Sequence, residues 1–341
     1  MQKLINNLLI IFFIVVSCSG GGGGTPTDSD DINDNIDPYA FPNAVNYNLA
    51  NQVEIVTWNI ETFARSHTNQ KDYVKNLLEK WNADIYLLQE IEQESELVSM
   101  VNSMPNYSYV VDDESKNLGF ALVYKTEYIT FNSKNELWAS TSSSPDGDSD
   151  YENNALYQFA GRPPMENYIT WSDGSKSINL YLIGIHYKCC GDGVYRNNDE
   201  ENEANRRHNA SLLLTDYILN NRANENVVVL GDFNNTGSNQ TISNPTLSPF
   251  TDSDSFDSAS SFKLTDLGIF QGSNINWSWQ GWNSSYSPTH FDHIIINQSL
   301  FSTNTTSRSH VISVPTESGM TSNNVDDKIS DHQPVMYRFY P

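Results

Sequence analysis

The hydrophobic pattern divides most of the chain into short apolar runs and longer amphipathic stretches. Short runs bounded by polar or turn residues predict buried strands, whereas apolar side chains spaced by three or four positions predict helices. Strands are predicted at residues 53–58, 84–88, 107–111, 119–124, 178–186, 227–230, 291–296 and 335–339. Helices are predicted at residues 71–81, 92–104 and 201–222, and polar surface loops at 140–154 and 235–260. Helices that alternate with strands, combined with direct steps from strand to strand, predict an α/β or α+β fold.

The beginning of the chain has a different pattern. Residues 8–16 form an unbroken apolar run, which is too short for a membrane-spanning helix of about 20 residues but suits a secretion signal. Soon after this run comes Cys18, which precedes the glycines 20–24. The arrangement resembles the lipobox of bacterial lipoproteins, in which such a cysteine carries the lipid. An ordinary cleaved signal peptide is the alternative.

The chain is therefore predicted to have three parts. Residues 1–17 are predicted to be a lipoprotein signal peptide, residues 18–51 a flexible tether rich in Gly and Asp, and residues 52–341 the folded domain. The corresponding location is outside the cytoplasm, with the protein lipid-anchored through Cys18 to a membrane of a bacterial cell envelope. That membrane is the outer membrane or the cell surface.

Composition narrows the class of protein. Hydrophobic residues make up 38% of the chain, which is enough for a sizeable core. The 42 acidic residues against 19 basic ones give a formal net charge of −23. Such a charge disfavours long-range attraction of nucleic acid, because that attraction depends on Lys and Arg neutralising phosphates. It does not disfavour an enzyme that meets phosphate through a metal ion and local contacts.

Two cysteines remain in the domain, and they are adjacent. Cys189 and Cys190 belong to a protein predicted to be exported, where disulfides persist. A disulfide between the two neighbours and a pair of free thiols are both open interpretations. A zinc site is disfavoured, because two adjacent thiols alone make a poor tetrahedral site.

Polar residues follow several of the predicted strands at the point where each strand ends. The clusters are Trp58-Asn59, Gln89-Glu90, His186, the sequence Gly-Asp-Phe-Asn at 231–234 and Ser-Asp-His at 330–332. A strand that is buried in its middle can present the residues at its end to a shared cleft. Each cluster alone has an ordinary structural explanation as a turn or a helix start. Together they are all of metal-ligand or acid–base type, which favours a common site.

These motifs resemble the endonuclease/exonuclease/phosphatase superfamily, over residues 52–341. The resemblance is carried by Thr-Trp-Asn-Ile-Glu at 57–61, Leu-Gln-Glu at 88–90, Gly-Ile-His-Tyr-Lys at 184–188, Gly-Asp-Phe-Asn at 231–234, Phe-Asp-His at 291–293 and Ser-Asp-His-Gln-Pro-Val at 330–335. It implies a four-layer sandwich, in which two mixed β-sheets pack face to face and helices cover both outer faces. It also implies that the active site lies at one edge of the sandwich.

The resemblance implies a divalent metal, with Mg²⁺ expected and Mn²⁺ or Ca²⁺ as alternatives. Glu90 is the principal metal ligand expected in this family, with Asn59 and Asp331 as further ligands. Oxygen ligands of this kind suit Mg²⁺, which keeps several waters and takes one or two carboxylates together with substrate phosphate.

The same resemblance assigns the catalytic roles. His332 is expected as the catalytic imidazole, with Asp292 holding its other ring nitrogen. Asp232 and Asn234 are expected to bind the attacking water and the scissile phosphate. Whether Asp232 or His332 takes the proton from water stays open.

Two further positions are expected to contact or support the substrate. His186 stands where a residue that binds the phosphate or assists the leaving group is expected. Arg162, in Arg-Pro-Pro, either contacts phosphate or supports the site. The chain departs from the family pattern at His290, where an Arg is common.

Other candidate sites are weaker. Acidic residues at 146, 148, 150 and 152 alternate as in a calcium loop, but the required Gly and distant Glu are missing, so a solvated loop is favoured. Arg206 and Arg207 suggest a phosphate contact, with a solvated helix face as the default. The tryptophans at 277, 279 and 282 suggest base stacking, although packing is favoured.

The predicted function is that of a metal-dependent phosphoesterase, in its leading form a nuclease-like phosphodiesterase. We expect a monomer that binds DNA or RNA weakly, with no protein partner implied. A phosphomonoesterase and a sphingomyelinase-like lipid-head-group phosphodiesterase are the alternatives among enzymes. A catalytically inactive binding module is disfavoured, because Glu90, Asp232 and His332 are all present.

Overall fold

The computed structural model describes part of the chain, namely residues 41, 43–65, 68–115, 118–146, 151–196, 199–237, 240–251, 261–281, 287–305 and 307–341. The predicted signal peptide, the predicted lipidation site Cys18 and most of the predicted tether lie outside these residues. A compact unit spans Pro38–Pro341. Among the helices that the structure describes, none is long and apolar enough to cross a membrane.

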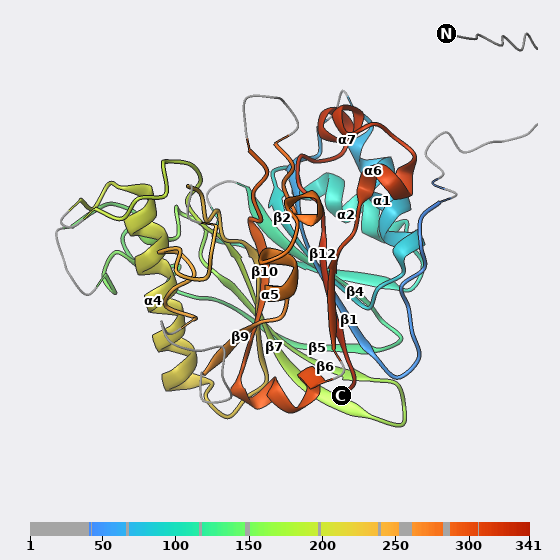
Figure 1. Cartoon of the computed structure of the whole chain (residues 1–341). Coiled ribbons are helices and arrows are strands. Elements are labelled where there is room, and N and C mark those ends of the chain that lie inside the picture. Colours follow the sequence, from blue (N-terminus) through green and yellow to red (C-terminus); the bar gives the residue numbers. More distant parts are fainter. Residues whose placement is uncertain are drawn as a thin grey trace, which may run out of the picture. The chain divides into compact units, whose positions relative to one another are not determined.

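Two six-stranded sheets form this unit (Figure 1). The first sheet has the order β11-β12-β1-β2-β4-β3, from strands β1 (Val53–Phe63), β2 (Ile85–Ile91), β3 (Tyr107–Val111), β4 (Gly119–Lys125), β11 (Arg308–Val311) and β12 (Val335–Phe339). The second has the order β5-β6-β7-β8-β10-β9, from strands β5 (Ile129–Glu136), β6 (Met165–Ser172), β7 (Ser177–His186), β8 (Val227–Asp232), β9 (Phe262–Leu264) and β10 (Asp292–Asn297). Both sheets are mixed, because β1 runs parallel to β2 and β7 parallel to β8 while the other pairs are antiparallel.

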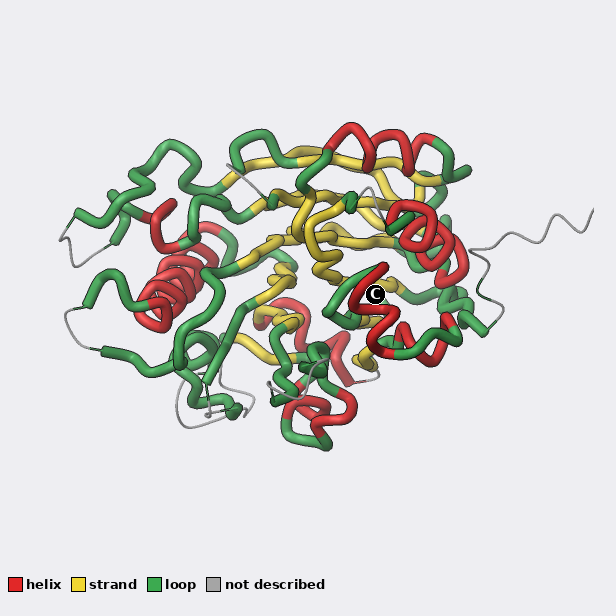
Figure 2. The backbone as a smooth tube through the Cα atoms, turned by 90° about the horizontal axis from the view of Figure 1, so that it is seen from above, coloured by secondary structure: helices red, strands yellow, loops and turns green. Residues whose placement is uncertain are grey.

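Helices cover the outer face of each sheet (Figure 2). The first sheet packs against α1 (Gln70–Trp81), α2 (Glu94–Asn102), α6 (Val314–Ser318) and α7 (Ser322–Lys328). The second packs against α3 (Ala155–Gln158), α4 (Glu203–Asn221) and α5 (Leu267–Phe270). Short 3₁₀ segments lie at Asn274–Asn276 and Gln298–Thr305. The four-layer sandwich predicted from the sequence is confirmed.

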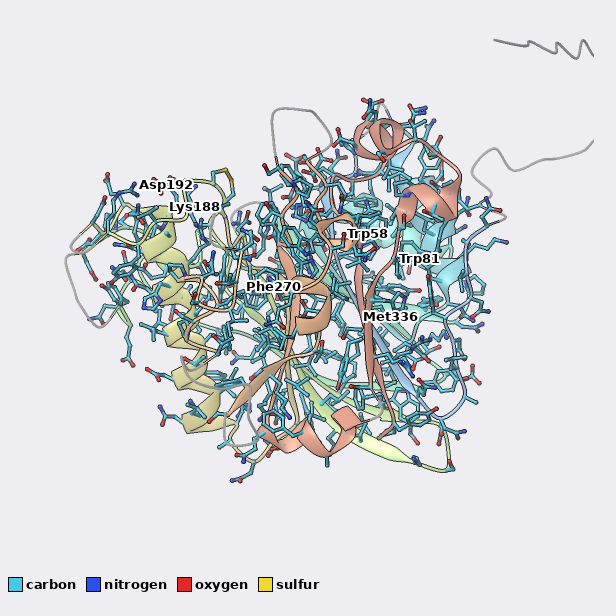
Figure 3. The ribbon with its side chains drawn as sticks, viewed as in Figure 1. Trp58, Trp81, Lys188, Asp192, Phe270 and Met336 are labelled. Atoms are coloured by element: carbon cyan, nitrogen blue, oxygen red, sulfur yellow. A yellow bond between two sulfur atoms is a disulfide. The ribbon has the colours of Figure 1, made fainter. Side chains whose placement is uncertain are left out.

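The central strands bury both of their faces. In β1, Ile55 points into the core between the two sheets, whereas Val56 and Trp58 point toward the helices of the first sheet. Trp58 packs there on Trp81 of α1, with ring centroids 5.2 Å apart (Figure 3). A strand buried on both faces has a continuous apolar run instead of a strict alternation, which explains the strand pattern of this sequence.

Residues before β1 also pack on the domain. Phe41 is buried, and the Tyr47 hydroxyl donates a hydrogen bond to the Glu317 carboxylate. The Trp81 indole donates to the same carboxylate at 2.6 Å. Phe41 and Tyr47, two residues of the predicted tether, therefore pack on the folded body.

The predicted elements differ from the structure mainly at the sheet edges. Strands β5, β6, β9 and β11 were not predicted, and β1 extends five residues beyond the predicted end at Trp58. Strand β5 is exposed at alternate or adjacent positions and contains Asn132, Ser133 and Lys134. It forms through its pairing with β6, because tertiary pairing overrides a weak local preference.

Candidate active site

Strand ends from both sheets meet at one edge of the sandwich. Asn59 of β1 is paired with Gln89 of β2 in the first sheet, next to Glu90. In the second sheet Asp232 of β8 is paired with His186 of β7 and with Asp292 of β10. The loop before β12 adds Asp331 and His332 from the first sheet.

Glu90, Asp232 and His186 face one another across the sheets. The Asn59 amide Nδ2 donates to Glu90 Oε1 at 3.0 Å and to Asp232 Oδ2 at 3.1 Å. His186 Nε2 lies 3.7 Å from the same two oxygens. The other oxygen of Glu90 accepts the backbone N–H of Thr62 at 2.9 Å. One oxygen of each carboxylate is thus turned toward a common space.

His332 and Asp292 form a buried pair beside these carboxylates. Their atoms Nδ1 and Oδ2 lie 2.7 Å apart, which is a charge-assisted hydrogen-bond distance. His332 Nε2 then faces Asp232 Oδ2 at 3.9 Å and Asp331 Oδ1 at 3.8 Å. Burial alone opposes the charged imidazolium, but the carboxylates of Asp292, Asp331 and Asp232 raise the pKa of His332 well above its ordinary value.

The pKa values of the other titratable groups of the site are shifted in opposite directions, and this separates the roles of these groups. Burial, together with the nearby Asp292 carboxylate, raises the pKa of Asp232 to about 7, even though His332 works in the opposite direction. Burial and the positive charges of Arg162 and His332 lower the pKa of His186 well below its ordinary value. Asp232 is therefore placed to exchange a proton near neutral pH, whereas His186 is neutral there.

Asp331 lies at the more open side of the site. Its Oδ2 accepts the indole N–H of Trp279 at 2.9 Å, and its backbone N–H donates to Glu61 at 3.1 Å. Burial and the Asp331 charge raise the pKa of Glu61 to about 7. Glu61, Asp326 and Asp331 form an acidic group whose ligand atoms lie within 4.8 Å of one another.

Two of the residues expected to contact the substrate, Arg162 and Asn234, support the backbone near the site. Arg162 is buried, and its Nε and Nη2 donate to the carbonyl oxygens of His186 and Tyr187 at 3.0 and 2.7 Å. The Asn234 side-chain amide donates to the Tyr187 carbonyl at 3.2 Å. The Asn234 backbone N–H donates to Asp232 Oδ1 at 2.8 Å. Arg162 and Asn234 therefore fix the loop after His186 and the orientation of Asp232.

The adjacent cysteines are joined by a disulfide at the turn after His186. Figure 3 labels Lys188 and Asp192 on this loop. Arg207 of α4 has no exposed surface, and its Nη1 donates to the carbonyls of Lys188 and Cys190 at 2.8 Å each. The expectation of a solvated helix face at this arginine was wrong, because its donors satisfy a loop that has few partners of its own.

Arg206, its neighbour on α4, is also buried, although the same solvated face was expected there. It donates to the Tyr157 carbonyl and its guanidinium lies 3.8 Å from the centre of the Tyr157 ring. The positive charge of this arginine is therefore used in packing α3 against α4.

The remaining weaker candidates take structural positions or lie outside the described residues. Asp146 accepts a hydrogen bond from Asn154 at 2.7 Å, whereas Asp148, Asp150 and Trp282 are outside the described residues. Trp277 donates to the carbonyl of Ile269 at 3.2 Å.

A comparison with known families decides which enzymes this site resembles. Residues 56–332 match the Endonuclease/Exonuclease/phosphatase family, and these residues include every strand end that forms the site. The chain belongs to this family. No curated protein matches the chain.

Solved structures of the endonuclease/exonuclease/phosphatase fold agree with this assignment. Danio rerio TDP2, complexed with single-strand DNA product, superposes with a TM-score of 0.57 at 13% identity, over 85% of this chain and 99% of that one. The endonuclease/exonuclease/phosphatase of Bacteroides vulgatus gives 0.52 at 14% identity, over 84% and 98%. The mannosyl-6-phosphatase Bt3783 of Bacteroides thetaiotaomicron gives 0.51 at 13% identity, over 84% and 99%. At these identities the likeness concerns the fold.

Members of the family are phosphoesterases, so the protein is a hydrolase that acts on phosphate ester bonds. The family depends on divalent metals, and this chain has the acidic and histidine clusters that such metals require. The Glu90 carboxylate keeps 16% of its side-chain surface exposed and that of Asp331 keeps 29%. Accessible carboxylate oxygens suit a hard cation such as Mg²⁺. The residues present therefore fit the expected metal.

The side-chain amide of Asn59 donates to both carboxylates of the site. Its Oδ1 accepts the backbone N–H of Glu61 at 3.0 Å, and this bond fixes the amide so that its N–H groups face the two carboxylates. Asn59 thus orients Glu90 and Asp232 as a hydrogen-bond donor. The sequence identifies the residue but not the direction of its amide.

The sequence did not identify two buried residues behind the site, Ser278 and Asp266. Ser278 accepts the backbone N–H groups of Phe291 and Asp292, each at 3.1 Å. Asp266 contacts both His290 and His293. The departure from the family pattern at His290 was a signal in the sequence, but its partner Asp266 is 24 residues away and carries no motif.

Proposed function

We propose that the protein is a divalent-metal-dependent phosphodiesterase that hydrolyses nucleic-acid phosphodiester bonds outside the cytoplasm. The observation that carries this proposal is the placement of Asp232 between the His332–Asp292 pair and Glu90. Asp232 Oδ2 lies 3.9 Å from His332 Nε2, and the Asn59 amide joins the same oxygen to Glu90 Oε1, which belongs to the carboxylate expected to bind the metal. A phosphate between His332 and Glu90 would meet both.

The charge around the site supports a phosphodiester over a phosphomonoester. The guanidinium groups of Arg162, Arg206 and Arg207 donate to protein carbonyls and hydroxyls. A phosphomonoester carries close to two negative charges at neutral pH and a phosphodiester carries one, so a monoester requires more free positive charge. A site whose neighbouring arginines are occupied suits the monoanion better.

Aromatic rings beside His332 support a nucleic-acid substrate. Phe291 and Trp279 are half-buried, with ring centroids 5.3 Å apart, and the Phe291 ring centroid lies 5.9 Å from that of His332. Base–aromatic stacking contributes about 1–3 kcal/mol per base and tolerates any sequence. The base next to the scissile phosphate is proposed to pack on this pair of rings. Such local binding fits a chain with a net charge of −23, which attracts polyphosphate poorly at long range.

The chemistry follows from the positions of the protons. A bound divalent cation supplies stabilisation of the charge on the phosphoryl and leaving oxygens. Asp232, with its pKa raised to about 7, takes the proton of the attacking water. His332 holds its proton at Nε2 and donates to a phosphate oxygen, because Asp292 fixes the opposite nitrogen. His186, neutral at this pH, hydrogen-bonds the phosphate through Nε2.

The proposed location rests on the sequence. An apolar run at 8–16 followed by Cys18 supports export and lipid anchoring to a bacterial envelope membrane, with the domain acting as a monomer on nucleic acid outside the cell interior. Labelling of cells with radioactive palmitate, in wild type and in C18S, tests the anchor. Label that persists in C18S would reject it.

A substrate panel tests the proposed activity. Purified protein with Mg²⁺ is assayed on plasmid DNA, single-stranded RNA, sphingomyelin, inositol phosphates and mannose 6-phosphate, with H332A as the control for contaminating enzymes. We expect turnover of DNA or RNA that disappears in H332A. Turnover confined to the monoesters or to sphingomyelin would reject the nucleic-acid proposal in favour of that substrate.

The aromatic contact has its own control. F291L keeps the size and apolarity of the side chain but removes the ring face. We expect KM for a short oligonucleotide to rise several-fold in F291L, while KM for bis(p-nitrophenyl) phosphate changes less than twofold. Equal changes for both substrates would contradict stacking of a base on Phe291.

A further inference from the structure

Ser278 lies where the two sheets meet behind the site. Its hydroxyl oxygen accepts the backbone N–H groups of Phe291 and Asp292, each at 3.1 Å, and Asp292 begins β10 of the second sheet. Its carbonyl oxygen accepts the backbone N–H of Gln333 at 2.6 Å, directly after His332 of the first sheet. One buried residue therefore holds the main chain on both sides of the His332–Asp292 hydrogen bond.

The residue after Ser278 continues the same connection. Trp279 forms antiparallel bridges with Thr289 and with His332, and its indole reaches Asp331. The segment at 278–279 thus crosses the edge of the sandwich as a short strap. It links the strand that carries Asp292 to the loop that carries His332.

The Asp292 carboxylate depends on this backbone support. Its Oδ2 is engaged by His332, whereas its Oδ1 is buried without a hydrogen-bond partner among the described residues. No second side chain among these residues therefore fixes the carboxylate through Oδ1. The direction of the Asp292 carboxylate is set by its main chain, and the Asp292 N–H is held by Ser278.

Ser278 is held in turn by His290. The Ser278 backbone N–H donates to His290 Nδ1 at 3.0 Å, so Nδ1 must be an acceptor. The proton of the neutral ring is then on Nε2, which donates to Asp266 Oδ2 at 2.9 Å. A single backbone hydrogen bond in this way fixes the tautomer of His290.

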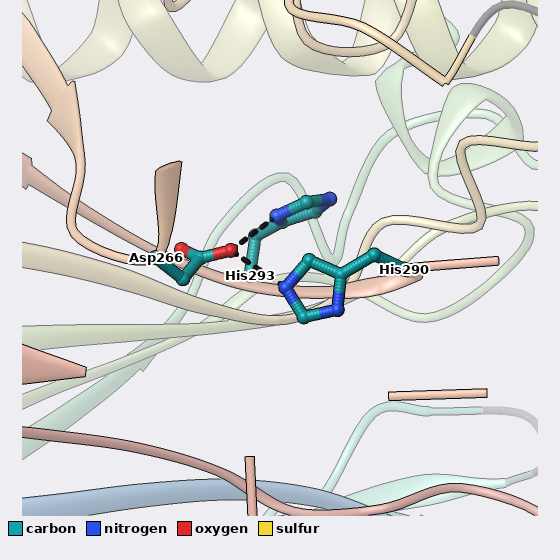
Figure 4. Close-up of side chains that lie close together, drawn as sticks. All are labelled: Asp266, His290 and His293. Carbon is teal, nitrogen blue, oxygen red and sulfur yellow. Dashed lines mark hydrogen bonds and ion pairs between the residues drawn. The ribbon is translucent and has the colours of Figure 1, made fainter. Parts of the chain in front are cut away.

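Asp266 completes the chain of contacts (Figure 4). Its Oδ2 also accepts from His293 Nδ1 at 2.7 Å, and its Oδ1 accepts from the Ile294 backbone at 3.2 Å. Burial works to raise the pKa of Asp266, but the two histidines hold it well below its ordinary value. The carboxylate is therefore a buried anion whose charge is balanced by N–H donors from three directions.

The same three side chains have the composition of a metal site, but the hydrogen bonds oppose that interpretation. Coordination through His290 Nε2 would move its proton to Nδ1. Nδ1–H would then face the Ser278 N–H, and two donors would oppose each other in a fully buried place. Burying an unsatisfied polar group of this kind costs about 1–3 kcal/mol.

We propose that Asp266, His290 and Ser278 act as a positioning chain that sets the geometry of the His332–Asp292 pair across the two sheets. This inference rests on the proposed phosphodiesterase function, in which His332 contacts the phosphate. Displacement of a reacting group by about 1 Å can cost about a hundredfold in rate. The three residues act through the backbone of Asp292 and Gln333, and none of them touches the substrate.

A matched pair of variants tests the proposal. His290 and His293 are both fully buried and both donate to the same oxygen of Asp266, but His290 alone of the two contacts Ser278. H290Q keeps a donor toward Asp266 and removes the acceptor of the Ser278 N–H. We expect kcat to fall at least tenfold in H290Q with KM unchanged within twofold, and H293Q to keep kcat within twofold. Equal losses of kcat in the two variants would overturn the proposal.

Three further variants distinguish an effect on the position of the His332–Asp292 pair from an effect on folding. S278A removes the hydroxyl and should lower kcat at least tenfold, whereas S278T keeps the hydroxyl and should recover most of it. H290N keeps an acceptor at the place of Nδ1 and should retain more kcat than H290Q. Each variant is compared at a temperature well below its thermal midpoint, so that the folded fraction is the same. A loss of kcat in S278A that S278T does not recover would count against the chain.

A readout without turnover separates this inference from the proposed activity. Two-bond ¹H–¹⁵N spectra of the wild-type imidazoles should show His290 protonated at Nε2 and His293 at Nδ1, and hydrogen exchange at the Asp292 amide should accelerate in S278A. The opposite tautomer at His290, or unchanged exchange at Asp292, would overturn the positioning chain. If the wild-type tautomers and the faster exchange in S278A are both as expected but the wild-type protein hydrolyses no phosphodiester, the proposed function alone is rejected.

Discussion

The two parallel strands β1 and β2 have acidic side chains near both of their ends, and the two ends behave differently. At the amino ends Glu54 lies near Asp84, just before β2. At the carboxyl ends Asn59 contacts Glu90. The register is shared, because Ile55 pairs with Ile85 and Asn59 pairs with Gln89. The same pair of strands therefore supports a closed acid cluster at one end and the candidate active site at the other.

The closed cluster is internally compensated. Burial and the Asp84 charge raise the pKa of Glu54 to about 9, and burial raises the pKa of Asp84. The Lys125 ammonium lies 3.5 Å from Asp84, and the Trp171 indole donates to the same carboxylate at 2.8 Å. Burial lowers the pKa of Lys125. The cation and the indole donor therefore satisfy Asp84. The Leu49 backbone N–H donates to Glu54 Oε1 at 2.9 Å, whereas Glu54 Oε2 is buried without a hydrogen-bond partner among the described residues.

The comparison shows that a buried acid with a raised pKa does not by itself mark an active site. Asp232 and Glu54 both have one. The active end differs because residues of both sheets converge there and because Glu90 keeps part of its carboxylate exposed. Partial access and several acceptors turned toward one space are what allow a ligand to bind.

Chelation should have the largest effect and should act at one end only. Removal of divalent cations with EDTA is expected to reduce hydrolysis to background, and Mg²⁺ or Mn²⁺ should restore it. E90Q should require at least tenfold more Mg²⁺ for half-maximal rate, whereas E54Q should require the same amount as wild type. Full activity in metal-free buffer would contradict the metal-ligand role of Glu90.

Removal of the carboxylate charge should distinguish the two ends next most strongly. D232N is expected to lower kcat by about a thousandfold, which is within the range of general-base and electrostatic contributions. E54Q should keep kcat within twofold, because a carboxyl with a pKa of about 9 is already neutral at pH 7. Circular dichroism checks that both variants fold. A D232N protein with a tenth or more of wild-type kcat would exclude Asp232 as the base.

The pH dependence of the rate should be determined by Asp232 and His332, at the carboxyl ends of the strands. Asp232 must be ionised to accept a proton, so kcat/KM should fall about tenfold per pH unit below its pKa of about 7. The raised pKa of His332 keeps its proton through neutral pH, and the rate should fall again where His332 deprotonates. H332Q should lose the alkaline limb and E54Q should keep both. An alkaline limb that persists in H332Q would assign it to another group.

The smallest predicted effect on the reaction rate comes from the closed end, where the change to be measured is in stability. Native Glu54 keeps its proton up to a pH of about 9, whereas the unfolded chain loses it near its ordinary value. Between these two pH values the native state therefore binds one more proton than the unfolded chain. This proton stabilises the native state at low pH, and the stabilisation is lost as pH rises through this window. The free energy of unfolding of wild type relative to E54Q should fall by at most about 1.4 kcal/mol per pH unit. Urea denaturation at pH 5, 7 and 9 measures it, and a constant difference would contradict the raised pKa of Glu54.

The sequence predicts the central part of the fold well. Strand β12 lies at the predicted residues, and β4 and α1 each differ from the prediction by one residue at one end, because a continuous apolar run or a helical spacing is a local signal. The edge strands β5 and β11 have no such signal. They form because a neighbouring strand offers unpaired backbone groups, and this depends on residues far away in the chain.

The candidate site is predicted in its residues but not in their orientation. The strand-end motifs identify Glu90, Asp232 and His332, which the structure places around one space. The direction of the Asn59 amide is set by the backbone N–H of Glu61, and the backbone role of Arg162 by two carbonyls. Contacts of this type depend on the folded main chain, so residue identity does not reveal them.

Residues of both sheets form the site, and this determines at which stage of its synthesis the enzyme can become active. Glu90 lies early in the chain, whereas His332 takes its place only when β12 pairs with β1, whose residues 53–57 match 335–339. A ribosome reaches β12 about 270 residues after it has made β1. Until then the nascent chain has most of its acids but lacks the imidazole. A partly made or unfolded chain therefore cannot hydrolyse a phosphate ester, and hydrolysis begins only when the final sheet closes.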